Sequence, residues 1–146
     1  MSGATLPAAI AQALEGWHRY LETNEAALLR PLVADDVVFR SPVAHTPYPG
    51  PDAIVLVLTT VNTVFENFQY HREFFSADGL NVGLEFSASI DGKALKGIDL
   101  IRFHPDGKIA EFEVMVRPAS GLAALQAAMG ARLAAKKDSL TGAAAS

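Results

Sequence analysis

The dipeptide Asp-Gly occurs three times between Tyr70 and Arg117, and this repetition constrains the fold more than any other feature of the sequence. The three copies are Asp78-Gly79, Asp91-Gly92 and Asp106-Gly107, and each is flanked by residues of strand character. Asp-Gly between such runs is a strong hairpin signal, because both turn positions favour a positive φ. The segment therefore predicts a four-stranded antiparallel meander.

One carboxylate lies in the middle of an otherwise apolar strand of this meander, Gly97 to Phe103. If side chains alternate between the two faces of the strand, Gly97, Ile101 and Phe103 share the face of Asp99. Desolvation among such neighbours should raise the pKa of the carboxyl group, and burial costs free energy unless the group is hydrogen-bonded. Asp99 is therefore a catalytic acid or base, a polar anchor for a ligand, or a structural carboxylate, and these three interpretations stay open.

Helices are predicted on both sides of the meander. Apolar residues recur at helical spacing in 6–21, with Thr5 available as N-cap, in 51–65 and in 120–133. The 51–65 helix is so apolar that we expect it to be buried on most sides. Between the first two helices the sequence predicts a short helix from Thr23 that Pro31 kinks or divides, a strand at 37–39 and a Pro-rich loop at 42–51.

This order of elements predicts an α+β fold, in which the N-terminal helices pack in the concave face of a curved, cone-shaped antiparallel sheet. Such a cone can stay partly empty inside, which is the usual form of a small-molecule pocket. The length of 146 residues favours a single domain, residues 1–146, with an ordered core at about 5–136. The tail from Gly142 to Ser146 has little to pack with, so we expect it to be frayed.

Composition excludes several functional classes. The net charge of -4 and the absence of a basic cluster beyond Lys136-Lys137 argue against nucleic-acid binding. No apolar run approaches the ~20 residues of a membrane-spanning helix, so we expect a soluble protein with no membrane partner. The chain has no cysteine, and its N-terminus lacks the basic residues of a secretory signal. These features favour a cytoplasmic location.

Several short motifs, taken in order, resemble one superfamily over nearly the whole chain. They are Leu32-Val33-Ala34-Asp35-Asp36-Val37-Val38-Phe39, Ser41-Pro42-Val43, Tyr48-Pro49-Gly50, Gly97-Ile98-Asp99 with Phe103, and Asp106-Gly107-Lys108-Ile109. In order and spacing they resemble the nuclear-transport-factor-2-like superfamily, in its polyketide-cyclase (SnoaL-like) and steroid-isomerase-like branch. The resemblance implies the cone-shaped, cystatin-like fold.

The resemblance also implies roles for individual residues. Asp99 matches a strand acid that binds the developing enolate oxygen in isomerase-like members and acts in acid-base chemistry in the cyclases. The general base of the isomerases is an aspartate at the position of Ser41, and a serine lacks its basicity. Their oxyanion tyrosine maps to Trp17 or to Tyr20. Epoxide hydrolases of this fold are less similar, because their strand carries Arg-x-Asp where this chain has Gly97-Ile98-Asp99, and their second aspartate falls near Val114.

A mostly apolar pocket should bind a small hydrophobic molecule. We expect its walls to contain Trp17, Tyr20, Phe39, Phe65, Tyr70, Phe86, Phe103, Phe112 and Val114. His45 and Tyr48 of the Pro-rich loop are further ligand-binding candidates, although an exposed loop histidine and a packed tyrosine are the simpler interpretation. The histidines form no cluster with carboxylates at ligand spacing, and no Gly-rich phosphate loop occurs, so no metal and no cofactor are predicted.

Two hypotheses follow from these observations. The first is a cofactor-independent enzyme, similar to an isomerase, cyclase or hydrolase, with Asp99 as its central acid or base. The second is a non-catalytic module of the same fold that binds a hydrophobic ligand or only dimerises. Ser41 favours the second hypothesis, and the apolar setting of Asp99 favours the first. A homodimer is expected in either case, because members of the superfamily commonly pair through the outer face of the sheet.

Overall fold

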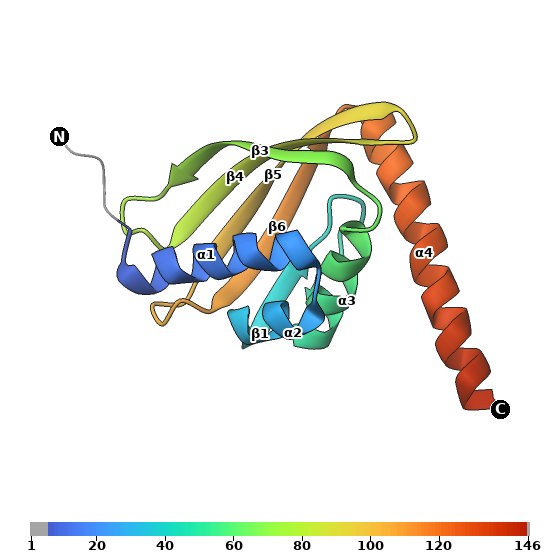
Figure 1. The fold of residues 1–146 in the computed structure, drawn as a ribbon, viewed down its shortest axis with the longest axis horizontal. Coiled ribbons are helices and arrows are strands. Elements are labelled where there is room, and N and C mark those ends of the chain that lie inside the picture. The colour runs from blue at the N-terminus through green and yellow to red at the C-terminus, as the bar shows by residue number, and fades with distance from the viewer. Residues whose placement is uncertain (1–5, 146) are drawn as a thin grey trace.

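The computed structural model describes the backbone of residues 6–145 and the side chains of residues 6–136. Helix α1 runs across the concave side of a curved sheet, and the long helix α4 leaves the last strand and passes beside α3 (Figure 1). The elements in chain order are α1 (Ala8–Thr23), α2 (Ala26–Leu29), the 3-10 helix η1 (Arg30–Leu32), β1 (Val33–Arg40), β2 (Tyr48–Pro49), α3 (Pro51–Val61), β3 (Glu66–Phe75), β4 (Asn81–Ile90), β5 (Lys93–Phe103), β6 (Ile109–Arg117) and α4 (Ala119–Ala145).

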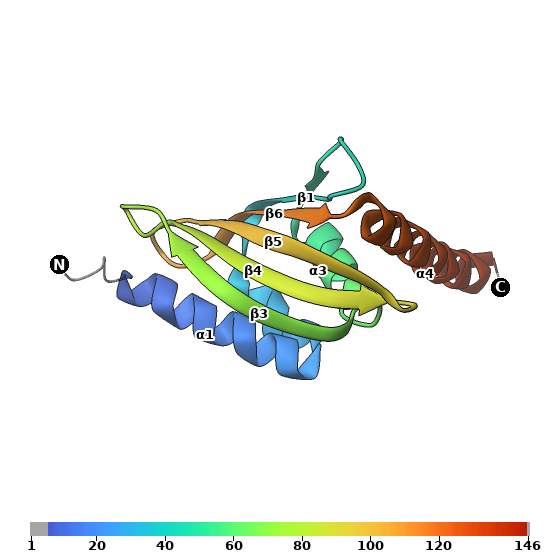
Figure 2. The ribbon, with the colours of Figure 1, turned by 90° about the horizontal axis from the view of Figure 1, so that it is seen from above.

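The six strands form one sheet in the order β2-β1-β6-β5-β4-β3. Strands β3 to β6 are successive antiparallel neighbours, which confirms the predicted meander. Strand β1 adds to the far side of β6 and runs parallel to it, with Phe39 opposite Phe112. The α+β cone is therefore confirmed, with one parallel pair in a sheet that was expected to be antiparallel. Figure 2 shows the curvature of the strands and α1 on one side of them.

The three Asp-Gly turns differ in backbone conformation. Both residues of Asp91-Gly92 have positive φ values, 50° and 78°, as expected for a two-residue hairpin turn. In the other two turns only the glycine has a positive φ. There the aspartate side chain accepts a backbone N–H instead: Asp78 bonds Leu80 N at 3.0 Å, and Asp106 bonds Lys108 N at 2.8 Å. The expectation of two positive φ values thus holds only at Asp91-Gly92. In the other two turns the loop is longer, and the aspartate side chain caps the backbone instead.

Helix α1 buries the predicted apolar stripe against the sheet, including Ile10, Leu14, Trp17 and Tyr20. Its N-cap residue is Pro7, and the expected cap Thr5 lies outside the described residues. Helix α2 is only one turn long, and the chain continues as the 3-10 helix η1, which contains Pro31. The predicted break at this proline is therefore confirmed.

Helix α3 begins as predicted, with Gly50 as N-cap at φ 94° and a proline in the first position. It ends at Val61, so Phe65 follows the helix rather than belonging to it. Ile54 and Leu58 are buried, whereas Leu56 is 42% exposed. The helix packs mainly on β1, and the face that carries Asp52 and Leu56 is exposed to solvent, while its other residues are buried or half-buried.

Helix α4 begins at Ala119, close to the predicted start, and buries Leu125 and Met129. Polar contacts join it to the end of α3: Arg132 donates to the Thr63 hydroxyl at 3.0 Å and Lys136 to the Thr60 hydroxyl at 2.6 Å. The side chains of the predicted frayed tail, 142–146, lie outside the described residues. No helix of the described part is long and apolar enough to cross a membrane.

The convex face of the sheet carries ion pairs beside exposed apolar side chains. Glu85 accepts two hydrogen bonds from Arg72, at 2.9 and 2.7 Å, and lies 3.1 Å from Lys96. Glu111 accepts a hydrogen bond from Arg40 at 2.6 Å. The large apolar residues exposed on this face are Phe74, Leu100 and Met115.

The concave face contains one contact that only a glycine allows. Gly97 of β5 lies beneath the ring of Phe86 on β4. A Cβ atom at position 97 would fall 2.5 Å from that ring and 2.6 Å from the backbone oxygen of Met115, distances that real Cβ atoms do not adopt. The Phe86 ring in turn packs at a tilt against Phe65 and stacks on Phe68, with ring centroids 5.6 and 5.1 Å away.

Candidate active site

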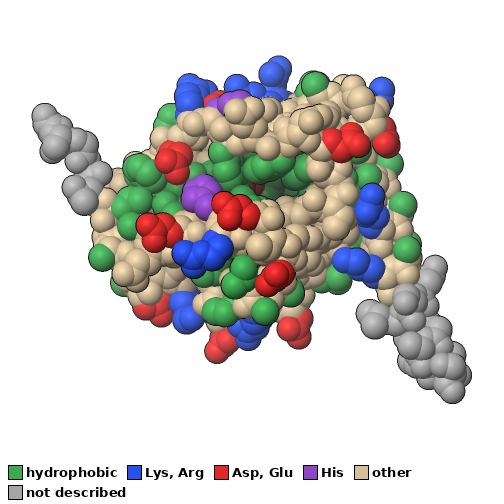
Figure 3. All heavy atoms as spheres, in the orientation of Figure 1, with side chains coloured by type: hydrophobic (Ala, Val, Ile, Leu, Met, Phe, Trp, Pro, Cys, Tyr) green, Lys and Arg blue, Asp and Glu red, His purple; other side chains and the backbone are tan. Residues whose placement is uncertain are grey.

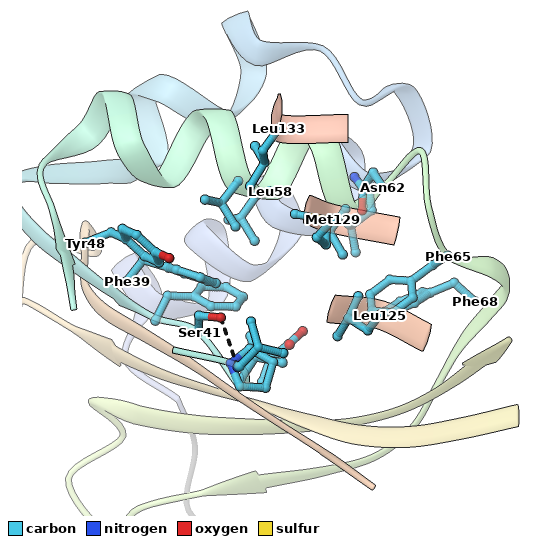
Figure 4. Close-up of a pocket in the computed structure, with 18 of the residues that line it drawn as sticks. Phe39, Ser41, Tyr48, Leu58, Asn62, Phe65, Phe68, Leu125, Met129 and Leu133 are labelled. Carbon is cyan, nitrogen blue, oxygen red and sulfur yellow. Dashed lines mark hydrogen bonds between the residues drawn. The ribbon is translucent and has the colours of Figure 1, made fainter. Parts of the chain in front are cut away.

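A mostly apolar cavity lies between the concave face of the sheet and helices α1, α3 and α4 (Figure 4). Figure 3 shows a hollow lined with hydrophobic side chains between α1 and the β3 edge. The space open to the centres of water-sized molecules is about 90 Å³, well above the ~10–15 Å³ that one water needs. The lining residues are Trp17, Leu21, Phe39, Ser41, Pro42, Val43, Tyr48, Val57, Leu58, Val61, Asn62, Phe65, Phe68, Tyr70, Asp99, Phe112, Val114, Leu125, Met129 and Leu133.

A chain of two hydrogen bonds crosses the wall of this cavity. The Trp17 indole Nε1–H donates to the Tyr70 hydroxyl at 2.9 Å, and that hydroxyl donates to Asp99 Oδ2 at 2.6 Å. The three residues come from α1, β3 and β5, so the site depends on the helix packing across the sheet. Tyr70 is thereby held with its proton directed at the carboxylate.

Burial changes the protonation of this pair. Asp99 is only 6% exposed, and desolvation raises its pKa to about 7, although the hydrogen bond from Tyr70 works in the opposite direction. Burial, followed by the charge of Asp99, raises the pKa of Tyr70 well above its ordinary value. Tyr70 therefore stays a neutral donor, while Asp99 is present both as acid and as carboxylate near neutral pH.

The second oxygen of Asp99 is available to a ligand. Only Oδ2 receives a hydrogen bond from Tyr70, and no buried side-chain oxygen or nitrogen in the described part of the chain lacks a partner. Because Asp99 lines the cavity, Oδ1 is reached from that side. In its ionised form this oxygen can accept a proton, and in its protonated form it can donate one to a carbonyl or enolate oxygen.

Two other polar side chains that line the cavity are Ser41 and Asn62. Ser41 accepts the backbone N–H of Val43 at 3.1 Å, which leaves its hydroxyl proton free to donate. Asn62 donates from Nδ2 to Asn24 Oδ1 at 3.0 Å. Among the described lining residues, Asp99 is the sole carboxylate, so Ser41 is not replaced by a second acid from elsewhere in the fold.

Eight of the residues that the sequence suggested for the site line the cavity. They are Trp17, Phe39, Tyr48, Phe65, Tyr70, Asp99, Phe112 and Val114. Of the two α1 residues considered for the cavity wall, Trp17 lines the cavity and Tyr20 does not. The Tyr20 hydroxyl donates to Asn24 Oδ1 at 2.9 Å instead. Tyr48 stacks on Phe39 with ring centroids 6.2 Å apart and is 37% exposed.

The other four suggested residues do not line the cavity. Tyr20 and Phe103 are buried in the main core between α1 and the sheet. Phe86 is covered by the rings of Phe65 and Phe68, which form the wall in its place. His45 is exposed in the Pro-rich loop. Alternation along a strand selects the correct face, but it does not say which residue on that face reaches the surface of the cavity.

Several lining residues were not anticipated. Phe68 alternates with Tyr70 on β3, so the same pattern that indicated Tyr70 could have indicated it. Leu125, Met129 and Leu133 were expected as the apolar stripe of a helix, and α4 places that stripe on the cavity. Figure 4 shows these three side chains reaching in from the helix.

A family model described as a SnoaL-like domain matches residues 14–112. A crystal structure of a steroid delta-isomerase from Pseudomonas aeruginosa is 51% identical, with a TM-score of 0.88 over 92% of this chain and 99% of that chain. A bacterial protein with a cystatin-like fold from Silicibacter pomeroyi is 30% identical, with a TM-score of 0.81 over 88% of this chain and 90% of that chain.

An NTF2-like protein from Mesorhizobium loti, 19% identical, has a TM-score of 0.67 over 80% of this chain and 98% of that chain. At this identity the likeness concerns the fold alone. No match was found among curated protein sequences. Together the matches confirm the resemblance to the nuclear-transport-factor-2-like superfamily that the sequence motifs indicated.

Proposed function

Because the chain belongs to the SnoaL-like domain family, we propose that it is a cofactor-independent isomerase or cyclase acting on a small, largely hydrophobic carbonyl compound. Asp99 is the central acid or base, and Tyr70 is its hydrogen-bond partner. The observation that carries the proposal is a buried carboxyl group that is bonded to a tyrosine at one oxygen and open to an apolar cavity at the other.

The similarity to a protein described as a steroid delta-isomerase supports this class of reaction, since the two chains are 51% identical over most of their length. Isomerisation of that kind moves a proton from one carbon to another. Such a step needs one group that accepts the proton and returns it, and an environment that keeps water out.

The Asp99 carboxyl group suits this step. Its ionised form can take a proton from a carbon next to a carbonyl group through Oδ1, which leaves an enolate, and can then return the proton to another carbon. Oδ2 stays bonded to Tyr70 throughout, so the carboxyl group keeps its orientation. A pKa raised to about 7 makes Asp99 a stronger base than an ordinary aspartate. This pKa is also close to neutral pH, where a general base works best.

A ligand-binding module is the second candidate function. The observation that favours it is the absence of a second carboxylate among the described lining residues, with a serine at the position of the isomerase base. In that case the Asp99 carboxyl group anchors a polar atom of the ligand, and the apolar walls supply the affinity.

Proton exchange in D₂O separates the two functions. A β,γ-unsaturated cyclic ketone is incubated with the protein, and deuterium incorporation and movement of the double bond are followed by NMR. We expect the wild type to catalyse both, and Asp99→Asn to lower the rate by about 10²–10⁴-fold. The matched control is Asp35→Asn, which makes the same chemical change at a side chain that is 97% exposed.

Asp99→Asn with unchanged exchange would contradict the proposed role of Asp99. A wild type that binds the ketone without catalysing exchange would support the ligand-binding module instead. Binding is measured in parallel by calorimetry, so both outcomes are visible in one set of samples.

A further inference from the structure

Four residues at the C-terminal ends of α1 and α3 form a hydrogen-bonded cluster beside the cavity. Asn24, the C-cap residue of α1, donates from Nδ2 to the backbone oxygen of Thr59 at 2.9 Å. Its Oδ1 accepts from the Tyr20 hydroxyl at 2.9 Å and from Asn62 Nδ2 at 3.0 Å. A backbone oxygen can only accept, so the bond to Thr59 determines which end of the Asn24 amide is the donor, and hence the orientation of Asn62 as well.

This orientation leaves Asn62 Oδ1 as a hydrogen-bond acceptor. No donor within the described residues bonds to it, and no buried side-chain oxygen of that part of the chain is left without a partner, so this oxygen is accessible. Asn62 lines the cavity, and Figure 4 shows it at the end of α3 beside Met129 and Phe65. An acceptor of known orientation therefore lies in an otherwise apolar part of the wall.

Asn62 and Asp99 are separated along the cavity. Trp17 of α1 bonds to Tyr70, which holds Asp99, whereas Asn24 at the end of the same helix holds Asn62. A helix rises ~1.5 Å per residue, so the two anchoring positions on α1 are roughly 10 Å apart. The cavity walls also include Leu21, Val57 and Val61, which offer no hydrogen bond from their side chains.

We infer that Asn62 is a specificity-determining residue that accepts a hydrogen bond from a hydroxyl group of the substrate. The substrate class is then a rigid hydrocarbon body with a carbonyl group at the Asp99 end and a hydroxyl donor at the Asn62 end. A ligand that places a hydrocarbon group against Asn62 Oδ1 leaves that acceptor unpaired and binds less tightly. The inference rests on the proposed function, because it assigns the same cavity to the substrate.

Two steroid probes that differ in a single group test this inference. Androst-4-en-3-one and its 17β-hydroxyl derivative, testosterone, share the carbonyl group and the hydrocarbon body. Calorimetric titration gives the ratio of their dissociation constants for the wild type and three variants. Asn62→Leu and Asn62→Ala both remove the acceptor, and the alanine variant serves if the leucine variant does not fold. Thr63→Val is the matched control, because Thr63 is adjacent, hydrogen-bonded and outside the cavity wall.

We expect the wild type and Thr63→Val to bind the hydroxylated probe about tenfold more tightly than the other. Both Asn62 variants should bind the two probes equally, with the affinity for androst-4-en-3-one unchanged or higher. A hydroxyl preference that survives in the Asn62 variants would overturn the inference, as would a wild type that binds the probes equally or binds neither. These ratios do not depend on turnover, so a wild type that catalyses no proton exchange, which would contradict the proposed catalysis, is a separate result.

Discussion

Replacing Asp99 by asparagine should make the protein more stable at high pH and leave its stability nearly unchanged at low pH. Asparagine keeps the size of the side chain, and its oxygen can still accept the hydrogen bond from Tyr70. It cannot ionise, so the variant removes only the cost of holding a negative charge in the cavity wall.

The size of the effect follows from the pKa of Asp99, which burial raises from 3.8 to about 7. Between these two values the unfolded chain loses its proton while the folded protein keeps it, so wild-type stability falls as the pH rises through this range and levels off above pH ~7. Each pKa unit corresponds to about 1.4 kcal/mol, so the total loss is about 4 kcal/mol. The other titratable groups are the same in both proteins and cancel in the difference.

Urea denaturation of both proteins at about pH 4, 5.5 and 8 measures this difference. The free energy of unfolding of Asp99→Asn, relative to wild type, should increase by about 4 kcal/mol across the series. A difference that does not change with pH would refute the assignment of Asp99 as a desolvated carboxyl group. A variant that is less stable by about 1–3 kcal/mol at pH 8 would show instead that the carboxylate is a structural group with favourable partners.

Two further predictions concern Tyr70 and the convex face of the sheet. Tyr70→Phe removes a hydrogen bond that lowers the pKa of Asp99, so the pH at which proton exchange reaches half its maximum should move upward. An unchanged or lower midpoint in the pH–rate profile would contradict this. We also propose that the protein is a homodimer paired through the convex face, where Phe74 and Met115 are each 49% exposed. Light scattering at micromolar concentration should report a dimer for the wild type and for the control Leu56→Glu, and a monomer for Met115→Glu. A monomeric wild type would exclude the dimer.

Most of the architecture was predictable because its signals are local. The Asp-Gly pairs mark the turns of the meander, Gly50 and Pro51 mark the start of α3, and the spacing of apolar residues marks α1 and α4. The position of Asp99 on an apolar strand face was also predictable, since alternation on β5 depends only on neighbouring residues. Features that follow from the chain's own periodicity are accessible without a structure.

The contacts of Asp99 were not predictable in the same way. Tyr70 lies on β3 and Asp99 on β5, with β4 between them, so their hydrogen bond depends on the curvature of the whole sheet. Likewise, the stripe of α4 indicated a helix, but its placement on the cavity depends on the direction in which the chain leaves β6. The parallel pairing of β1 with β6 is also set by the path of the chain between them rather than by either strand.

Gly97 shows that the shape of the cavity is determined partly by a position that does not line it. Any side chain there would have to displace the Phe86 ring and would also have to shift the backbone oxygen of Met115, which belongs to the β5–β6 ladder. The displaced ring would press on Phe65 and Phe68, which form the wall. A change at this position would therefore alter which molecules fit without altering any residue that touches them. Substrate range in this protein can thus change through substitutions behind the cavity wall as well as through substitutions of the lining residues.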